Sequence, residues 1–171
     1  MQKINFIKMH GLGNDFVIID KRKTDILITK ELINKLSDRK SGAGCDQLIT
    51  INSNSNKDID AQIEIFNPTG DKAEACGNGT RCVAKLLFLE SSKSRIKILS
   101  DAGILIAYNK EDSNISVNLG KVSYEWNKIP LAKKINTLNI PIKIKGFGNG
   151  IAPFFFRYLW SAYLYINIYY M

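Results

Sequence analysis

The sequence predicts an α+β fold in which an antiparallel or mixed sheet wraps around one central helix. Two observations lead to this prediction. Short segments that alternate apolar and polar residues recur along the first 120 residues, and such alternation is typical of half-buried strands. In addition, residues 83–89 are apolar nearly all round, which is typical of a helix enclosed by other elements.

Seven short segments, of which 3–8 and 62–66 alternate most clearly, are expected to form the strands of this sheet. They are residues 3–8, 15–20, 47–51, 62–66, 95–99, 104–108 and 115–119. The first two should pair as a hairpin, because the glycine-containing segment at 10–14 favours a turn between them. Thr29 is a suitable N-cap for a helix that ends at about Asp38. A polar loop at 52–60 separates the third and fourth strands.

The chain divides into two regions at about residue 120. Residues 1–120 hold all the predicted strands and both helices, so we expect them to form a complete domain. Residues 121–171 are too few for an equal second domain, and we expect an incomplete second half. Residues 151–171 contain nine of the 17 aromatic residues, a single charge and no strand or helix periodicity. They fit a transmembrane or interfacial helix, a fragment of a sheet or, the interpretation we favour, a frameshifted sequence never selected to fold.

The net charge of +8 is concentrated in the second region. Residues 1–120 contain 17 basic and 15 acidic residues, whereas 121–171 contain seven basic residues and one acidic residue. Nucleic-acid binding requires basic residues clustered on one face, and the region with the motifs has no such cluster. The N-terminus has no continuous apolar run of the signal-peptide type, and three cysteines fit a reducing compartment. We therefore expect a cytoplasmic protein that does not bind nucleic acid.

Cys76 is the strongest candidate for chemistry, because it stands directly before a Gly-Asn-Gly turn and the apolar helix. Free N–H groups and the helix dipole at such a position favour the thiolate. The same N–H groups can hold a carboxylate or a phosphate. Gly77 and Gly79 weaken a helix unless the backbone must approach something closely. The alternative interpretation is a structural cysteine, since free cysteines are often small buried apolar residues.

The other cysteines fit structural roles better than chemical ones. Cys82 lies inside the apolar helix and is expected in the core, and Cys45 follows a Gly-x-Gly turn where we also favour a structural role. A metal site built from the three cysteines and His10 would lack paired ligand spacings such as C-x-x-C. We therefore expect no metal.

Four amide side chains lie at or beside predicted turns and strand ends: Asn14, Gln47, Asn67 and Asn78. Asparagine favours turns for its own backbone reasons, and this explains three of the four. Gln47 is not explained in that way. Amides both donate and accept hydrogen bonds, so such a set around a helix start suits a ligand that carries an ammonium group and a carboxylate.

Four ordered motifs then resemble those of the diaminopimelate epimerase family. They are HGLGNDF at 10–16, GAGCDQ at 42–47, FNPTG at 66–70 and ACGNGTRC at 75–82, and the resemblance extends over about residues 3–120. It implies an isomerase without a cofactor that converts LL-diaminopimelate to the meso form for lysine and cell-wall synthesis. It also implies a homodimer and a fold of two pseudo-symmetric halves, each with a sheet around a helix.

The resemblance assigns roles to six residues. Cys76 matches one of the family's two catalytic cysteines. The positions that match substrate contacts are Asn14, Gln47 and Asn67, and those that match the cradle of the reacting carboxylate are Gly77 and Asn78. Two alternatives stay open: a related isomerase of the proline racemase or phenazine-biosynthesis type, and a non-catalytic remnant or membrane-associated protein.

The sequence departs from the family pattern in one respect. Inversion of an α-carbon needs a base on one face and an acid on the other, and the family uses a cysteine from each half. No cysteine follows Cys82 in this sequence. We therefore expect a truncated and impaired copy of the enzyme, with the second thiol missing.

Overall fold

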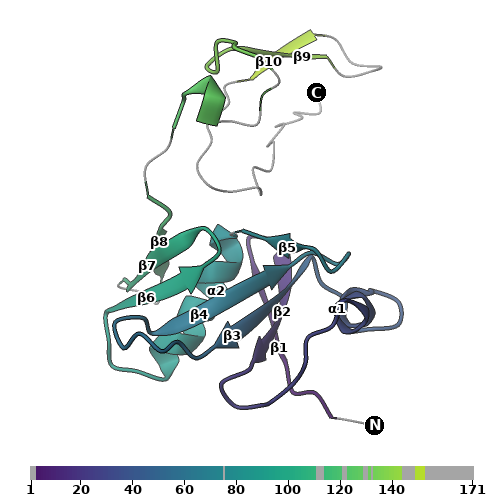
Figure 1. Cartoon of the computed structure of the whole chain (residues 1–171), viewed down its shortest axis with the longest axis vertical. Coiled ribbons are helices and arrows are strands. Elements are labelled where there is room, and N and C mark those ends of the chain that lie inside the picture. The colour runs from purple at the N-terminus through teal and green to yellow at the C-terminus, as the bar shows by residue number, and fades with distance from the viewer. Residues whose placement is uncertain are drawn as a thin grey trace. The chain divides into compact units, whose positions relative to one another are not determined.

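The computed structural model describes residues 3–74, 76–110, 114–120, 123–128, 131, 133–143 and 149–152. These fall into two compact units, Met1–Leu119 and Gly120–Met171. The second unit contains a short 3₁₀ helix (Trp126–Lys128) and an antiparallel pair of strands, β9 (Ile140–Lys143) and β10 (Asn149–Ala152). The first unit carries all the motifs, and the rest of the fold concerns it (Figure 1).

The first unit is a mixed eight-stranded sheet with two helices. Its strands are β1 (Ile7–Gly11), β2 (Asn14–Asp20), β3 (Gln47–Asn52), β4 (Ala61–Phe66), β5 (Lys72–Ala73), β6 (Arg95–Ser100), β7 (Gly103–Asn109) and β8 (Ile115–Asn118). The helices are α1 (Lys30–Ser37) and α2 (Gly77–Leu89). The strand order is β1-β2-β3-β4-β6-β7-β8, with β5 paired to β4. The pairs β2–β3 and β4–β6 are parallel and the others antiparallel.

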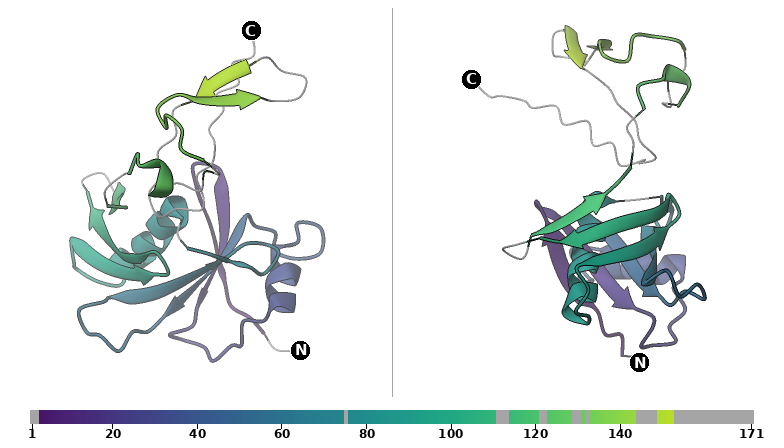
Figure 2. Two further views of the ribbon diagram at one scale, coloured as in Figure 1. Left: turned by 45° about the horizontal axis from the view of Figure 1, so that its top comes forward. Right: turned by 90° about the vertical axis from the view of Figure 1, so that its left-hand side faces the viewer.

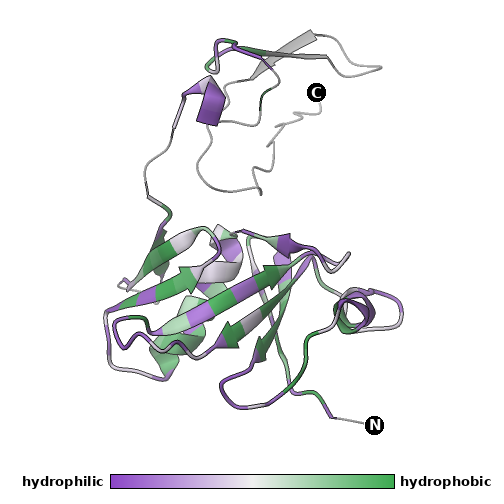
Figure 3. Cartoon of the chain, viewed as in Figure 1, coloured by the Kyte–Doolittle hydropathy of each residue, from purple (hydrophilic) through white to green (hydrophobic). Residues whose placement is uncertain are grey.

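The sheet curls around α2, as the two views of Figure 2 show. The helix contacts both edge strands, β1 and β8, and also β2, β6 and β7. This confirms the predicted fold class. The alternation of hydrophobic and hydrophilic residues along the strands is visible in Figure 3. Strand β2 instead has a continuous apolar run that is buried on both faces. Because successive side chains point to opposite faces, Phe16 and Ile18 lie in the core around α2, and Val17 and Ile19 lie in a second core beside α1.

Local sequence signals explain α1 and the first hairpin. Thr29 caps α1, and its Oγ1 accepts a hydrogen bond from the Leu32 backbone N–H at 3.2 Å. In the hairpin, β1 begins at Ile7 rather than at residue 3 and continues to Gly11. The turn is therefore limited to Leu12 and Gly13. Both have positive φ, which is the backbone conformation that favoured two-residue hairpin turns adopt.

Helix α2 is enclosed along most of its length, but its end is not. Its buried hydrophobic residues belong to the core around α2, whereas Leu89 is 77% exposed. Gly79 explains how the helix lies so close to the sheet. A Cβ at this position would lie 2.5 Å from Ile49 Cδ1 and 3.2 Å from Phe16 Cε1. The backbone at Gly79 therefore approaches core side chains closely. This explains the glycine without a ligand that binds to the backbone there.

Candidate functional site

One end of the sheet gathers the predicted amides. Asn14 begins β2 and Gln47 begins β3, and these strands are parallel. Asn67 follows β4, which is antiparallel to β3, so its end lies beside the beginning of the other two. Strand direction alone thus brings three residues from distant motifs to the same edge.

Gln47 is the most unusual of these amides. It is 5% exposed, and its Nε2 donates a hydrogen bond to Asn67 Oδ1 at 3.1 Å. Its other atom, Oε1, is buried and has no hydrogen-bond partner among the described residues. A buried acceptor without a donor is unfavourable by about 1–3 kcal/mol, and most such atoms in folded proteins are satisfied. This oxygen therefore suits a donor supplied by a ligand.

Cys76 lies at the same end, where it caps α2. Its Sγ accepts a hydrogen bond from the Gly79 backbone N–H at 3.4 Å. The sulfur also donates to Asn14 Oδ1 at 3.6 Å. Only 3% of the residue is exposed, so a reagent or ligand must open a path to reach it.

The thiol is less acidic than its position at a helix start suggests. Burial raises the pKa of Cys76 above its ordinary value, because it penalises the thiolate. The N–H groups of Gly79 and Asn78 and the charge of Arg81 lower the pKa, and the Asp46 charge raises it further. The helix start does favour the thiolate, as expected from the sequence, but desolvation outweighs it and the net direction of the pKa is upward.

The backbone and side chains in the first turn of α2 already contact other groups of the protein. The N–H groups of Asn78 and Gly79 act on the sulfur of Cys76, and the Asn78 side-chain oxygen accepts a hydrogen bond from Arg81. A Cβ on Gly77 would lie 3.2 Å from Leu119 Cδ1. The predicted carboxylate cradle is thus packed closely, and a ligand there would share N–H groups with the thiol.

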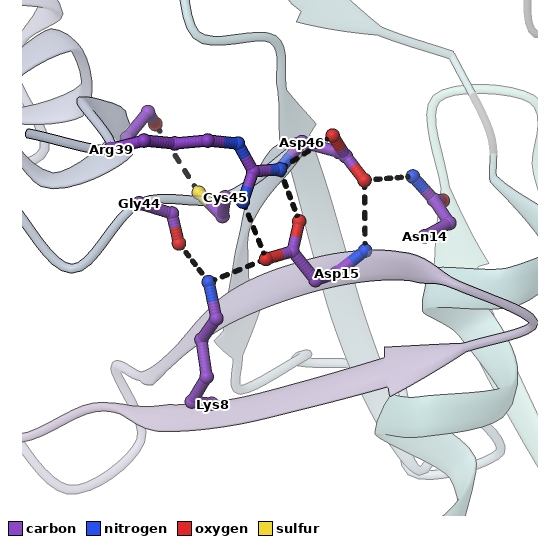
Figure 4. A network of polar contacts seen from close by, with 8 residues as sticks. Lys8, Asn14, Asp15, Arg39, Gly44, Cys45 and Asp46 are labelled. Carbon is purple, nitrogen blue, oxygen red and sulfur yellow. Dashed lines mark hydrogen bonds and ion pairs between the residues drawn. The ribbon is translucent and has the colours of Figure 1, made fainter.

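An ion-pair cluster that the motifs did not single out adjoins the amides (Figure 4). Arg39 donates to both carboxylate oxygens of Asp15, at 2.7 and 3.0 Å, and to Asp46 Oδ1 at 2.8 Å. Lys8 pairs with Asp15 at 2.8 Å and donates to the Gly44 carbonyl. The pKa of Asp15 lies below its usual range, chiefly because of Arg39. Asp15 and Asp46 stand inside the quoted motifs, and only the fold shows that they share one arginine.

The remaining cysteines lie in the cores. Cys82 belongs to the core around α2, and Cys45 to the core beside α1, where its sulfur contacts Ser37 Oγ at 3.4 Å. No group of three histidine, cysteine, aspartate or glutamate side chains suited to a metal occurs in the described part of the chain. Within the same residues no helix has the length and apolar character needed to cross a bilayer. Most of residues 151–171, which suggested a membrane segment, lies outside the described residues.

Solved structures share this architecture. A probable proline racemase from Agrobacterium radiobacter K84, solved with bound carbonate, superposes with a TM-score of 0.61 over 87% of this chain and 48% of that one. The sequence identity is 13%, so this likeness concerns the fold alone.

The sequence comparisons are more specific. The profile of the diaminopimelate epimerase family matches residues 6–125, and the chain belongs to this family. It is 46% identical over 141 residues to a diaminopimelate epimerase of Pelagibacter ubique, and 42% identical over 138 residues to one of Zymomonas mobilis. These matches cover 82% and 81% of this chain but 50% and 49% of the relatives. The chain thus spans about half the length of the curated relatives it matches.

Proposed function

We propose that residues 1–120 form the N-terminal half-site of a diaminopimelate epimerase, with residues 121–171 as an incomplete beginning of the second half. In this proposal Cys76 exchanges a proton with the α-carbon of one stereocentre. The buried Gln47 Oε1 carries the argument, because an amino-acid ammonium group would supply its missing donor. Family membership, at 46% identity to the Pelagibacter protein, supports the choice of diaminopimelate as the ligand.

The other residues have roles that follow from their positions. Asn14 and Asn67 present amides at the same edge and would contact the substrate. The backbone at Gly77 and Asn78 would hold the α-carboxylate at the start of α2. Fixed N–H dipoles aimed at a carboxylate stabilise the charge that grows when the α-proton leaves. The proposal needs no cofactor, because this stabilisation comes from the chain itself.

The proposal includes an impaired activity. A two-base inversion requires a second thiol opposite Cys76, and the sequence has no cysteine beyond Cys82. We expect the purified chain to bind LL-diaminopimelate without forming the meso isomer. Calorimetric titration tests binding, and 1,5-diaminopentane, which lacks both carboxylates, is the control ligand. Absence of binding would contradict the half-site.

The impairment has its own test. The chain is incubated with LL-diaminopimelate in deuterated water. The products are separated by chiral chromatography, and their deuterium content is measured by mass spectrometry. Robust formation of meso product with deuterium at one carbon would contradict the impaired state. A substrate panel that includes proline distinguishes the related racemases, whose shared fold supports no choice of substrate. A homodimer stays a prediction.

A further inference from the structure

An asparagine amide has two ends that differ in chemistry, and its neighbours decide which end faces the site. The oxygen only accepts hydrogen bonds, and the NH₂ group only donates them. At Asn14 the Nδ2 atom donates to Asp46 Oδ2 at 3.0 Å, and the Oδ1 atom faces the Cys76 sulfur at 3.6 Å. A carboxylate accepts only, so Asp46 can bind only the NH₂ end of Asn14.

Asp46 is itself held by contacts with Asp15 and Arg39. Its Oδ2 also accepts the Asp15 backbone N–H at 3.0 Å, and its Oδ1 accepts from Arg39 at 2.8 Å. The backbone N–H of Asp46 donates to Asp15 Oδ1 at 2.9 Å. Figure 4 shows these contacts leading from Arg39 through Asp46 to Asn14. The carboxylate therefore has little freedom to release the amide.

We propose that Asp46 is a positioning residue that holds Asn14 as an acceptor for the thiol proton of Cys76, with Arg39 keeping Asp46 in place. The inference rests on the proposed role of Cys76 and adds a direction to it. An acceptor beside a sulfur stabilises the protonated thiol, whereas an NH₂ group there would stabilise the thiolate. Before substrate arrives, this half-site thus presents a thiol, the acid of a two-base pair.

The test measures the rate at which iodoacetamide alkylates Cys76 as a function of pH, read from the mass of the peptide that contains it. In Asp46→Asn, the new amide cannot satisfy Arg39 and Asn14 at once while keeping both orientations. Asn14 is then free to turn its NH₂ group to the sulfur. We expect alkylation at neutral pH to rise about fivefold, the effect of one hydrogen bond, with the midpoint shifted to lower pH.

A change of charge alone would also favour the thiolate, so the experiment needs a double-mutant cycle. In the Asn14→Ala background, Asp46→Asn should change the alkylation rate by less than about twofold, because the amide that transmits the effect is gone. An equal increase in both backgrounds would show that Asp46 acts by its charge and would overturn the proposal. The matched control is Asp60→Asn. Asp60 also accepts from a lysine and a backbone N–H, at the far end of β4, and its loss should leave Cys76 unchanged.

Arg39→Gln provides a second, independent variant if Asp46→Asn fails to fold. It removes the hydrogen bond that holds the Asp46 carboxylate in place, so Asn14 is held less firmly in its orientation. The proposal therefore predicts faster alkylation of Cys76. Loss of a positive charge alone predicts slower alkylation. A slower or unchanged rate would overturn the proposal.

None of these variants replaces another ionisable side chain on α2 or on the strands that contact it. These side chains are Arg81, Cys82 and Lys85 on α2, Lys8 and His10 on β1, Asp15 and Asp20 on β2, Arg95 and Lys97 on β6, and Tyr108 on β7, and β8 carries none. The cycle uses no ligand. It therefore decides the role of Asp46 separately from the binding of diaminopimelate, whose failure would contradict the half-site instead.

Discussion

The two ends of the β2 strand carry similar charge clusters with different connections. At the end away from Cys76, Arg22 and Lys23 pair with Asp20 and Glu90 at 2.7–3.3 Å. The bidentate contact of Arg22 with Asp20 lowers the pKa of that carboxyl group. This cluster joins the loop after β2 to the end of α2, and its side-chain contacts are between charged groups.

The cluster at the site end has the same composition, two bases and two acids, but it continues into the protein. Lys8 and Arg39 pair with Asp15, and Arg39 also pairs with Asp46, which binds Asn14. The amide of Asn14 then reaches the buried thiol. Exposed ion pairs alone contribute little to stability. The comparison of the two ends therefore teaches that an ion pair matters to the chemistry of a site through the side chain that it orients.

The largest expected effect on stability concerns the packing that fixes the site end. Gly79→Ala places a methyl group 2.5 Å from Ile49 Cδ1, and we expect the free energy of unfolding to fall by about 1–3 kcal/mol. Urea denaturation followed by circular dichroism measures the change. Gly11→Ala is the control, because its Cβ would meet only Asn78 atoms at an ordinary 3.4 Å or more. Equal stability of both variants would contradict the close packing of α2.

Two glutamines differ in whether the side-chain oxygen has a hydrogen-bond donor, and their substitution tests whether Gln47 is suited to a ligand. Gln47→Leu removes the unsatisfied oxygen and also the hydrogen bond to Asn67, and these effects oppose each other, so the free energy of unfolding should change by less than about 1 kcal/mol, while diaminopimelate binding is lost. Gln62 lies at the other end of the adjacent strand, and its Oε1 accepts from Asn54 at 3.0 Å. Gln62→Leu should therefore lower stability and keep binding. A loss of stability greater than the one hydrogen bond to Asn67 explains, about 1.5 kcal/mol, would mean that the Gln47 oxygen has a partner.

Acid sensitivity should be shared by the two ends. Ion pairs lower the pKa of both Asp15 and Asp20 in the folded chain. The unfolded chain then binds protons first as the pH falls. The stabilisation is therefore complete above the unfolded pKa of about 4 and is lost as the pH falls toward the folded values. Asp15→Asn and Asp20→Asn should each flatten the fall in unfolding free energy between about pH 5 and pH 2. An unchanged slope in both would contradict these pKa directions.

The smallest effect is expected at the exposed pair of Lys23 with Glu90. The lysine side chain is 67% exposed, so solvent screens its charge. Lys23→Gln should leave the free energy of unfolding nearly unchanged. A thermal melt at low and high salt checks this, and a larger salt-dependent loss would show that the cluster holds α2 in place.

Local signals predicted much of the fold, and long-range pairing explains the rest. The cap at Thr29 and the strand at residues 47–51 are recognisable from neighbours in the sequence, and both predictions are confirmed. The two-residue strand β5 was missed because it has no pattern of its own and exists only by pairing with β4. The first strand was placed too early because alternation before Ile7 continues outside the hairpin register.

The candidate site shows the same division. The motifs identified Cys76 and the amides, because the residue type alone indicates a thiol that can exchange a proton and amides that can donate and accept hydrogen bonds. The contact of Asp46 with Asn14 depends on the parallel pairing of β2 and β3, which sequence spacing does not reveal. The raised pKa of Cys76 was missed for a related reason. Burial by the surrounding sheet, rather than the helix start visible in the sequence, dominates the free energy of the thiolate.

The central claim is that Cys76 belongs to a half-site for diaminopimelate, and ligand protection tests it most directly. The chain is alkylated with iodoacetamide with and without LL-diaminopimelate, and the peptides of Cys76 and Cys82 are quantified by mass spectrometry. We predict that the ligand slows modification of Cys76 and leaves the core residue Cys82 unchanged, while 1,5-diaminopentane protects neither. Equal modification of Cys76 with and without LL-diaminopimelate would contradict the account.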